Sequence, residues 1–318
     1  MAKKRTKEKP LFSILIPTYN RSNYVVESVQ SVIGQTNQDF EIIISNNAST
    51  DNTKKILQKL KEKDKRIEVF NQKKNLGSGG NVEFLLSKPK GKYVVILFDD
   101  DKLHEGFLSE VSRIFKENDV DYVYTNSFWI DKNSKVVHKN KKRLYPKGLI
   151  EKYGLLKDRY HFGICANAFK NRPNMKLKDK SLAGDYIFAL ELSLNGTGYY
   201  CHKNLFYYRF HSGNESQYGD LFERSVDVFD SLKRIYLSMP SKLKKKMEAG
   251  VLNNVYLTFF MSIFYQSIRK FDFKGLRKKY CLLSKKTGFF RIRCLGVLKF
   301  IKKLWLLVLS TITRSKYK

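Results

Sequence analysis

Hydrophobic and polar residues alternate with two different periods along the first 130 positions of the chain. Short apolar runs, each of a length typical of buried strands, cover residues 11–16, 40–44, 67–70, 93–98 and 122–125. Between these runs apolar residues recur at helical spacing, as in Val25, Val29 and Val32. Strands and helices that alternate in this way predict an α/β fold with a mostly parallel central sheet.

The pattern changes after residue 130. Strand and helix signals weaken between 130 and 183, and a helix is then predicted over 185–194. Two aromatic strands follow, at 199–201 and 205–210. Beyond residue 221 the pattern is helical, so we expect a domain boundary near Tyr218, with an α/β domain at 1–218 and a helical region at 219–318.

Charge sets the last part of the chain apart. The 318 residues include 61 Lys and Arg against 30 Asp and Glu, a formal charge of +31. Between Arg269 and Lys318 the only acidic residue is Asp272. Basic amphipathic helices of this kind bind anionic membrane surfaces, which is the interpretation we favour. The alternative is a helical bundle whose lysines are solvated.

Cysteines and apolar runs bear on the compartment. The four cysteines form no CxxC pair, and no histidine stands at zinc-ligand spacing, so a reducing compartment fits. The longest late apolar run, 304–309, is far shorter than the roughly 20 residues that span a bilayer. The apolar run at 11–16 is also shorter than a signal-peptide core. We therefore predict no transmembrane helix and a peripheral protein on the cytoplasmic face of the membrane.

Three consecutive aspartates, Asp99, Asp100 and Asp101, end the predicted strand at 93–98. Clustered carboxylates repel one another unless a cation or hydrogen-bond donors neutralise them. A metal ion bound there could hold a diphosphate. The alternative is that Asp101 caps the next helix and the other two are solvated.

Polar motifs also follow the other strands, at 17–21, 45–51 and 75–81. Ligands of open α/β sheets bind outside the carboxyl ends of the strands, where such turns meet. In their order along the chain, the four motifs resemble those of family 2 glycosyltransferases with the GT-A fold, from about Leu11 to Gln217. The segment 46–51 resembles the variant found in enzymes that assemble lipopolysaccharide and capsule repeat units. Members more often have acidic residues where this chain has Asn46 and Asn47.

The resemblance implies a site for a nucleotide-sugar donor, with a UDP-sugar favoured. Thr18, Tyr19 and Arg21 would line the base and ribose pocket, and Asp51 would hold its loop. The implied donor-binding residues are Pro17, Thr18, Tyr19, Arg21, Asn47, Asp51, Asn75, Gly77, Asn81, Asp99, Asp100, Arg209 and Ser216. Read without the resemblance, Arg21 is a surface charge, and the Asn75 to Asn81 stretch is a turn and helix cap.

The resemblance also implies a divalent metal, Mn²⁺ or Mg²⁺. Its carboxylate ligand comes from the family's Asp-x-Asp motif, whose register here is open by one residue, and we favour Asp101. His211, in the run Tyr208 to Ser216, is the second expected ligand, with Arg209 beside it to meet the diphosphate. A histidine at a strand end is otherwise usually structural.

The catalytic base implied by the resemblance is Asp185, with Glu191 as a second candidate. Asp185 would otherwise be a helix N-cap. The implied reaction is an inverting transfer of one hexosyl or N-acetylhexosaminyl residue to a glycan or lipid-linked acceptor of cell-envelope polysaccharide biosynthesis. The family's Gln-x-x-Arg-Trp motif of processive enzymes is absent. Two other classes stay open: a nucleic-acid-binding protein, although we expect no nucleic-acid partner, and an inactive GT-A scaffold.

Overall fold

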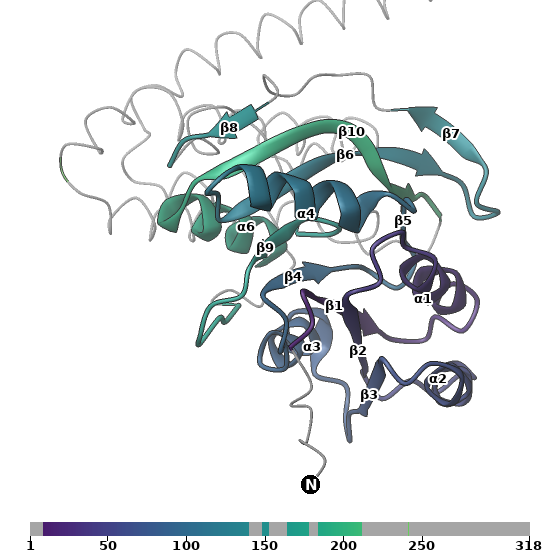
Figure 1. Cartoon of the computed structure of the whole chain (residues 1–318). Coiled ribbons are helices and arrows are strands. Elements are labelled where there is room, and N and C mark those ends of the chain that lie inside the picture. Colours follow the sequence, from purple (N-terminus) through teal and green to yellow (C-terminus); the bar gives the residue numbers. More distant parts are fainter. Residues whose placement is uncertain (1–8, 140–147, 153–163, 178–183, 212–240, 242–318) are drawn as a thin grey trace, which may run out of the picture. The chain divides into compact units, whose positions relative to one another are not determined.

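One mixed β-sheet forms the centre of the structure (Figure 1). The computed structural model describes residues 9–139, 148–152, 164–177, 184–211 and 241. The strands are β1 (Phe12–Thr18), β2 (Phe40–Asn46), β3 (Ile67–Asn71), β4 (Tyr93–Ile96), β5 (Lys102–Leu103), β6 (Tyr122–Ile130), β7 (Val136–Lys139), β8 (Gly148–Ile150), β9 (Ala168–Lys170) and β10 (Gly198–Arg209). The helices are α1 (Val25–Ile33), α2 (Thr53–Lys63), α3 (Gly77–Leu86), α4 (Phe107–Glu117) and α6 (Gly184–Asn195). The main strand order is β3-β2-β1-β4-β9-β6-β10-β5.

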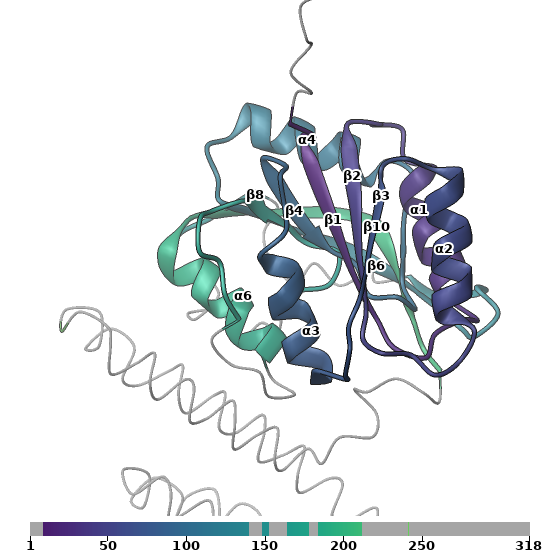
Figure 2. The same cartoon turned by 90° about the horizontal axis from the view of Figure 1, so that it is seen from below.

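The first four strands form a parallel half-sheet, as the sequence predicts. β1 lies between β2 and β4, with Phe12 opposite both Phe40 and Tyr93. Their apolar runs are continuous because both faces are covered by helices, and Ile14, for example, has no exposed surface. Figure 2 shows α1 and α2 together on one side of these strands and α3 on the other. The carboxyl ends of these four parallel strands therefore lie at the same edge of the sheet.

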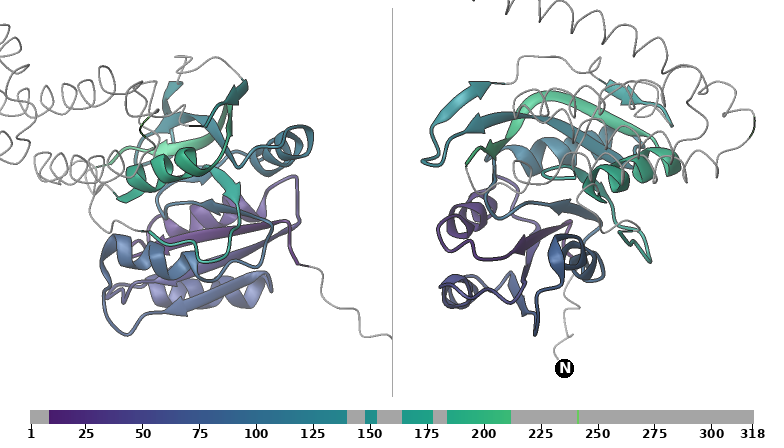
Figure 3. Two further views of the ribbon diagram at one scale, coloured as in Figure 1. Left: turned by 90° about the vertical axis from the view of Figure 1, so that its left-hand side faces the viewer. Right: turned by 180° about the vertical axis from the view of Figure 1, so that it is seen from behind.

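The second half of the sheet is mixed. The short strand β9 is antiparallel to both β4 and β6, and so joins the two halves. β6 and β10 run parallel, while β7, β8 and β5 add antiparallel edges. Figure 3 shows α4 and α6 on opposite sides of these strands. The predicted architecture, a mixed but mostly parallel sheet with helices on both faces, is confirmed.

Strand β10 corrects one expectation. The two aromatic strands predicted at 199–201 and 205–210 are a single strand of 12 residues. Its register against β6 shifts between Cys201 and Asn204 and again between Asn204 and Phe206. Such bulges absorb extra residues without ending a strand. The polar run at 202–204 marks this irregularity and not a turn.

The helical region predicted at 219–318 and the boundary near Tyr218 lie outside the described residues, apart from residue 241. In the part of the chain that the structure does describe, no helix has both the length and the apolar character needed to cross a membrane.

Candidate functional site

The polar loops after β1, β2 and β4 meet at the carboxyl edge of the parallel half-sheet. The N–H of Tyr19 donates to Asp99 Oδ2 at 3.3 Å. The N–H of Asn47 donates to the carbonyl of Thr18 at 2.9 Å. Three segments that are far apart in the sequence are thus joined close to the ends of their strands, as the strand-end pattern predicts.

Asn20 and Asp51 lock the first two loops together. Asn20 has a positive φ of 52°, and its Oδ1 accepts the N–H of Thr50 at 2.8 Å. The Asp51 carboxylate accepts the N–H groups of Ser22 at 3.1 Å and Thr53 at 2.9 Å. Burial raises the pKa of Asp51, but the hydrogen bonds from Thr53 and Ser22 outweigh it and bring the pKa to about 2. Asp51 therefore stays ionised and holds the loop beside Arg21.

Residues at the entrance of the site are more exposed than those that support it. Pro17 is partly buried and lies opposite Ser45, and Thr18 is 2% exposed. Tyr19 follows with 42% of its surface exposed. Its ring is available to a planar ligand at the carboxyl edge, whereas Thr18 belongs to the floor.

Asn47 connects the second loop to the third. Its Nδ2 donates to Asn75 Oδ1 at 2.9 Å and to the Gly77 carbonyl at 3.2 Å, while its Oδ1 accepts the N–H of Leu76 at 2.8 Å. Gly77 has a φ of 74°, a conformation that glycine adopts readily. An amide is needed at position 47 because it donates and accepts at once.

Asn81 lies beneath this loop and is 2% exposed. Its Nδ2 donates to the Ser45 carbonyl at 3.0 Å, and its Oδ1 accepts the Ser45 hydroxyl at 2.6 Å. In this structure Asn81 fastens α3 to the end of β2.

Arg21 faces the acidic segment. Its Nε lies 3.7 Å from Asp99 Oδ1 and 4.0 Å from Asp100 Oδ2, with a quarter of its side chain exposed. A guanidinium there lowers the repulsion between the two carboxylates. Burial, followed by the charge of Asp100, nevertheless raises the pKa of Asp99 above its ordinary value.

Asp100 and His211 lie side by side. His211 Nε2 lies 3.0 Å from Asp100 Oδ2, and both side chains are largely buried. They come from the loop after β4 and the end of β10, 111 positions apart. The predicted histidine is therefore brought to Asp100 and not to Asp101.

Asp101 is enclosed. It is 1% exposed, its Oδ1 accepts the N–H of Arg209 at 2.8 Å, and its Oδ2 lies 3.0 Å from Cys165 Sγ. Burial and the charge of Asp100 raise the pKa of Asp101. Both oxygens of the favoured metal ligand are thus occupied by contacts within the protein.

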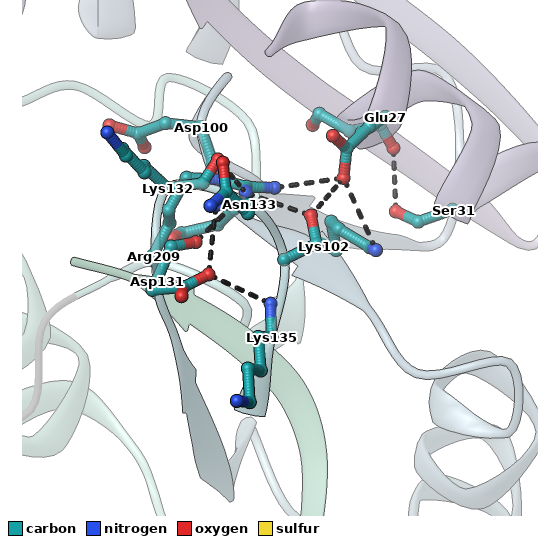
Figure 4. A network of polar contacts seen from close by, with 12 residues as sticks. Glu27, Ser31, Asp100, Lys102, Asp131, Lys132, Asn133, Lys135 and Arg209 are labelled. Carbon is teal, nitrogen blue, oxygen red and sulfur yellow. Dashed lines mark hydrogen bonds and ion pairs between the residues drawn. The ribbon is translucent and has the colours of Figure 1, made fainter. Parts of the chain in front are cut away.

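Arg209 is fully buried, with no exposed surface. The sequence predicts that it meets a diphosphate. In the structure its guanidinium instead bonds to protein groups, among them the Asp100 carbonyl at 2.7 Å and Glu27 Oε2 at 3.0 Å (Figure 4).

Two predicted residues cannot be placed in the site. Asp185 belongs to the first turn of α6, but its side chain is not among those described. Ser216 lies outside the described residues.

The structure adds residues that the sequence gave little reason to select. Cys165 contacts Asp101, and the Tyr24 ring packs against that of His211 in a tilted arrangement, with 4.8 Å between ring centroids. Tyr24 directly precedes α1, and a ring at a helix start is an unspecific signal. Cys165 lies in the stretch where strand and helix signals were weakest.

The donor set fits a divalent ion held jointly with a substrate. Among the described residues no group of three or more His, Cys, Asp or Glu side chains could hold a metal by itself. Asp100 and His211 could supply two ligands. Magnesium-type sites commonly take one or two carboxylates and complete their shell with substrate phosphates and water. The loop that carries Arg21 lies beside the pair, with Arg21 Nε 4.0 Å from Asp100 Oδ2.

Comparison with known proteins points to one family. The family model "Glycosyl transferase family 2" matches residues 13–176. A Campylobacter jejuni protein named GalNAc(5)-diNAcBac-PP-undecaprenol beta-1,3-glucosyltransferase is 37% identical over 105 residues, covering 33% of this chain and 34% of that protein. A Bacillus subtilis protein, "Putative teichuronic acid biosynthesis glycosyltransferase TuaG", is 33% identical over 120 residues, covering 38% and 48%. The chain spans about half or less of the length of such relatives.

Solved structures share the fold at low identity. S. aureus TarS residues 1–349 with UDP-GlcNAc aligns with a TM-score of 0.65 and 19% identity, over 76% of this chain and 72% of that one. The mannosyltransferase PcManGT of Pyrobaculum calidifontis, with GDP-Man and Mn²⁺, aligns with a TM-score of 0.58 and 14% identity, over 94% and 81%.

Proposed function

The chain belongs to glycosyltransferase family 2, and from this membership we propose that it is an inverting, metal-dependent enzyme that transfers one sugar from a nucleotide-sugar donor to an acceptor hydroxyl. The observation that carries the proposal is the Asp100–His211 pair, at 3.0 Å, beside the converging strand-end loops. The sugar is a hexosyl or N-acetylhexosaminyl residue.

The donor occupies the carboxyl edge of the parallel half-sheet. The exposed ring of Tyr19 stacks on the base, and Arg21, already directed toward two carboxylates, supplies charge near the phosphates. We propose a UDP-sugar. The titles of two structural neighbours name UDP-GlcNAc and GDP-Man, which supports a nucleotide sugar but leaves the base to experiment.

Asp100 and His211 would hold the divalent ion, Mn²⁺ or Mg²⁺, and the donor diphosphate would complete its binding. We assign the ligand to Asp100 in place of the Asp101 favoured from sequence, because the oxygens of Asp101 already contact Arg209 and Cys165. When bound, the ion neutralises charge that develops on the leaving diphosphate.

The chain's own residues supply the rest of the chemistry. Asp185, in the first turn of α6, accepts the proton of the acceptor hydroxyl. The acceptor oxygen then attacks the anomeric carbon from the side opposite the diphosphate, and the bond to the diphosphate oxygen breaks, which inverts the configuration. Because no processive motif is present, the product leaves after one transfer.

The acceptor is a lipid-linked glycan of the cell envelope. Two relatives carry names that refer to an undecaprenol-linked substrate and to teichuronic acid biosynthesis. The basic region at 269–318 would hold the enzyme at the cytoplasmic face of the membrane, where it meets such acceptors.

A ligand screen tests this assignment. Nucleotide sugars with different bases are added to the protein with MnCl₂ or with EDTA, and the unfolding temperature is measured. A ligand at 100 times its Kd stabilises the folded state by about 2.7 kcal/mol, roughly 5–10 °C for a domain of this size. We expect one base to give this shift only with manganese. No shift with any of them would disprove the donor site.

The catalytic base is tested by Asp185→Asn. We expect kcat to fall by about 10²–10⁴ while the donor still binds, because proton removal is lost and the donor loops are unchanged. Sugar transfer is followed by release of the nucleoside diphosphate. The matched control, Glu191→Gln on the same helix, should stay within a few-fold of the parent. A larger loss in the control than in Asp185→Asn would move the base to Glu191.

A further inference from the structure

The guanidinium of Arg209 is embedded in the protein at the end of β10. All three of its nitrogens donate hydrogen bonds. Nε reaches the Asp100 carbonyl at 2.7 Å, and one terminal nitrogen reaches the carbonyls of Asp131 at 3.2 Å and Lys132 at 3.3 Å and the Ser134 hydroxyl at 2.9 Å. The other terminal nitrogen donates to Glu27. A planar guanidinium whose nitrogens all donate to protein acceptors is held in place by the protein itself.

Glu27 anchors this arrangement from α1. Its Oε2 accepts from Arg209 at 3.0 Å and from the Ser134 hydroxyl, and lies 3.4 Å from Lys102 Nζ (Figure 4). Helix α1, strand β5, the turn after β6 and the end of β10 therefore converge on one carboxylate. Burial raises the pKa of Glu27, but the hydrogen bonds and charges of Ser134, Arg209 and Lys102 together outweigh it and hold the pKa below its ordinary value.

The same arginine fixes both members of the Asp100–His211 pair. Its Nε holds the backbone of Asp100, and its own N–H is bound by Asp101 Oδ1 at 2.8 Å. His211 follows two positions later on the same strand end. The ring of Tyr24 completes the link, with 4.8 Å to the Arg209 guanidinium and 4.8 Å to the His211 ring.

From this geometry we infer that Arg209 is a positioning residue of the metal site: anchored by Glu27, it holds Asp100 and His211 at the separation in which they bind the ion. The inference rests on the proposed function. It differs from the role implied by the family resemblance, in which Arg209 touches the diphosphate. The Arg209 side chain is fully buried and its nitrogens donate to protein acceptors, which favours the positioning role over contact with the diphosphate.

The test compares Arg209→Lys and Glu27→Ala with the parent chain. Lysine keeps the positive charge but cannot bridge the acceptors that the guanidinium bridges. Isothermal titration measures binding of UDP, or of whichever nucleoside diphosphate the parent binds best, once with MnCl₂ and once with EDTA. The ratio of the two Kd values is the gain in affinity that the metal provides.

We expect Arg209→Lys to reduce this gain by about 10–100-fold, the usual effect of losing a residue that orients metal ligands. The Kd in EDTA should stay near the parent value, and Glu27→Ala should change the gain in the same direction. Arg66→Lys is the matched control, because Arg66 also bonds a carboxylate, Asp64, and lies over an aromatic ring, that of Phe40. It lies away from the pair and should leave the gain unchanged.

Each other result is decisive. If Arg209→Lys weakens binding equally in EDTA, the residue contacts the phosphates and the inference fails. If both Kd values are unchanged in both variants, the inference also fails while the proposed function stands. If Arg209→Lys does not fold, Glu27→Ala, whose side chain is 41% exposed, decides the matter alone. A parent chain that binds no nucleoside diphosphate under either condition would overturn the proposed function and this inference with it.

Discussion

Three neighbouring aspartates have three different environments at the scale of single residues. Asp99 accepts a backbone N–H from the loop after β1, Asp100 faces His211, and Asp101 is enclosed by Arg209 and Cys165. Three identical carboxyl groups thus differ in their properties because their surroundings differ. Of the three, Asp100 is the one that lies against a histidine ring nitrogen.

Substitution of these aspartates should separate binding from stability. In Asp100→Asn the carbonyl that Arg209 holds is retained, so the unfolding temperature should change little while kcat/KM falls by about 10²–10³. In Asp101→Ala the buried N–H of Arg209 loses its acceptor, which should cost about 1–3 kcal/mol in the free energy of unfolding. Urea denaturation and initial rates measure the two effects. The reverse assignment, with Asp101 as ligand, requires the larger kinetic loss in Asp101→Ala without loss of stability.

Asn47 gives a second prediction at this scale. In Asn47→Asp a carboxylate oxygen replaces the amide nitrogen that donates to Asn75 Oδ1 and to the Gly77 carbonyl. Both acceptors then lose their donor and face a negatively charged oxygen instead. We expect the free energy of unfolding to fall by about 1–3 kcal/mol. Urea denaturation checks it. Asn52→Asp, at the exposed N-cap of α2, makes the same change of charge and should be nearly neutral.

Some residues could be found from the sequence and others could not. Tyr19, Asp51 and Asp100 lie in the loops that follow buried strands, and such loops meet at one edge wherever a parallel sheet forms. The role of Arg209 depends on Glu27, 182 positions away, and on a turn between two strands. No local pattern encodes such a contact.

At the scale of elements, strand runs in the parallel half were predictable because both faces are buried, which makes the runs continuous and apolar. The strands β5 and β9 have two and three residues, too few to show a period. The sequence pattern predicts two strands in place of β10 because the bulge puts polar residues inside the strand. The continuous strand is defined by its pairing with β6, which a local pattern does not contain.

Glu110 of α4 accepts a hydrogen bond from Lys203 of β10 at 2.8 Å. This carboxylate predicts that the stability of the fold depends on pH. Hydrogen bonds from Arg113, with Lys203 adding to them, bring the pKa of Glu110 to about 2, below its ordinary 4.5. A carboxylate with a depressed pKa in the folded state stabilises the fold above the unfolded pKa and loses that effect as the pH falls through the folded one. The contribution of Glu110 should therefore be complete above pH 4.5 and disappear between pH 4.5 and about 2.

Urea denaturation from pH 6 to pH 2.5 measures this contribution. Glu110→Gln should be less stable than the parent at pH 6, and the difference should shrink at the acid end. Glu117→Gln, which removes a more exposed partner of Arg113, should show a smaller difference throughout. An equal pH response in parent and Glu110→Gln would contradict the prediction.

At the scale of the whole molecule, the uneven charge predicts association with anionic membranes. Basic residues near such a surface contribute about 1 kcal/mol each, and salt screens them. The full chain should sediment with phosphatidylglycerol vesicles, less so at high salt, and not with phosphatidylcholine vesicles. Lys278→Glu with Lys279→Glu should weaken this binding more than Lys54→Glu with Lys55→Glu, on the exposed face of α2. Equal loss in both pairs would argue against a role of the basic region.

The short strand β9, which joins the two halves of the sheet, has a consequence for the order of folding. The parallel half is built from segments close in sequence, whereas Asp100 and His211 lie 111 positions apart on either side of that junction. Contacts over long separations form late because closing the larger loop costs more entropy. During refolding, helical signal should therefore return before the protein can bind manganese with a nucleotide, and this binding would report the closing of the sheet.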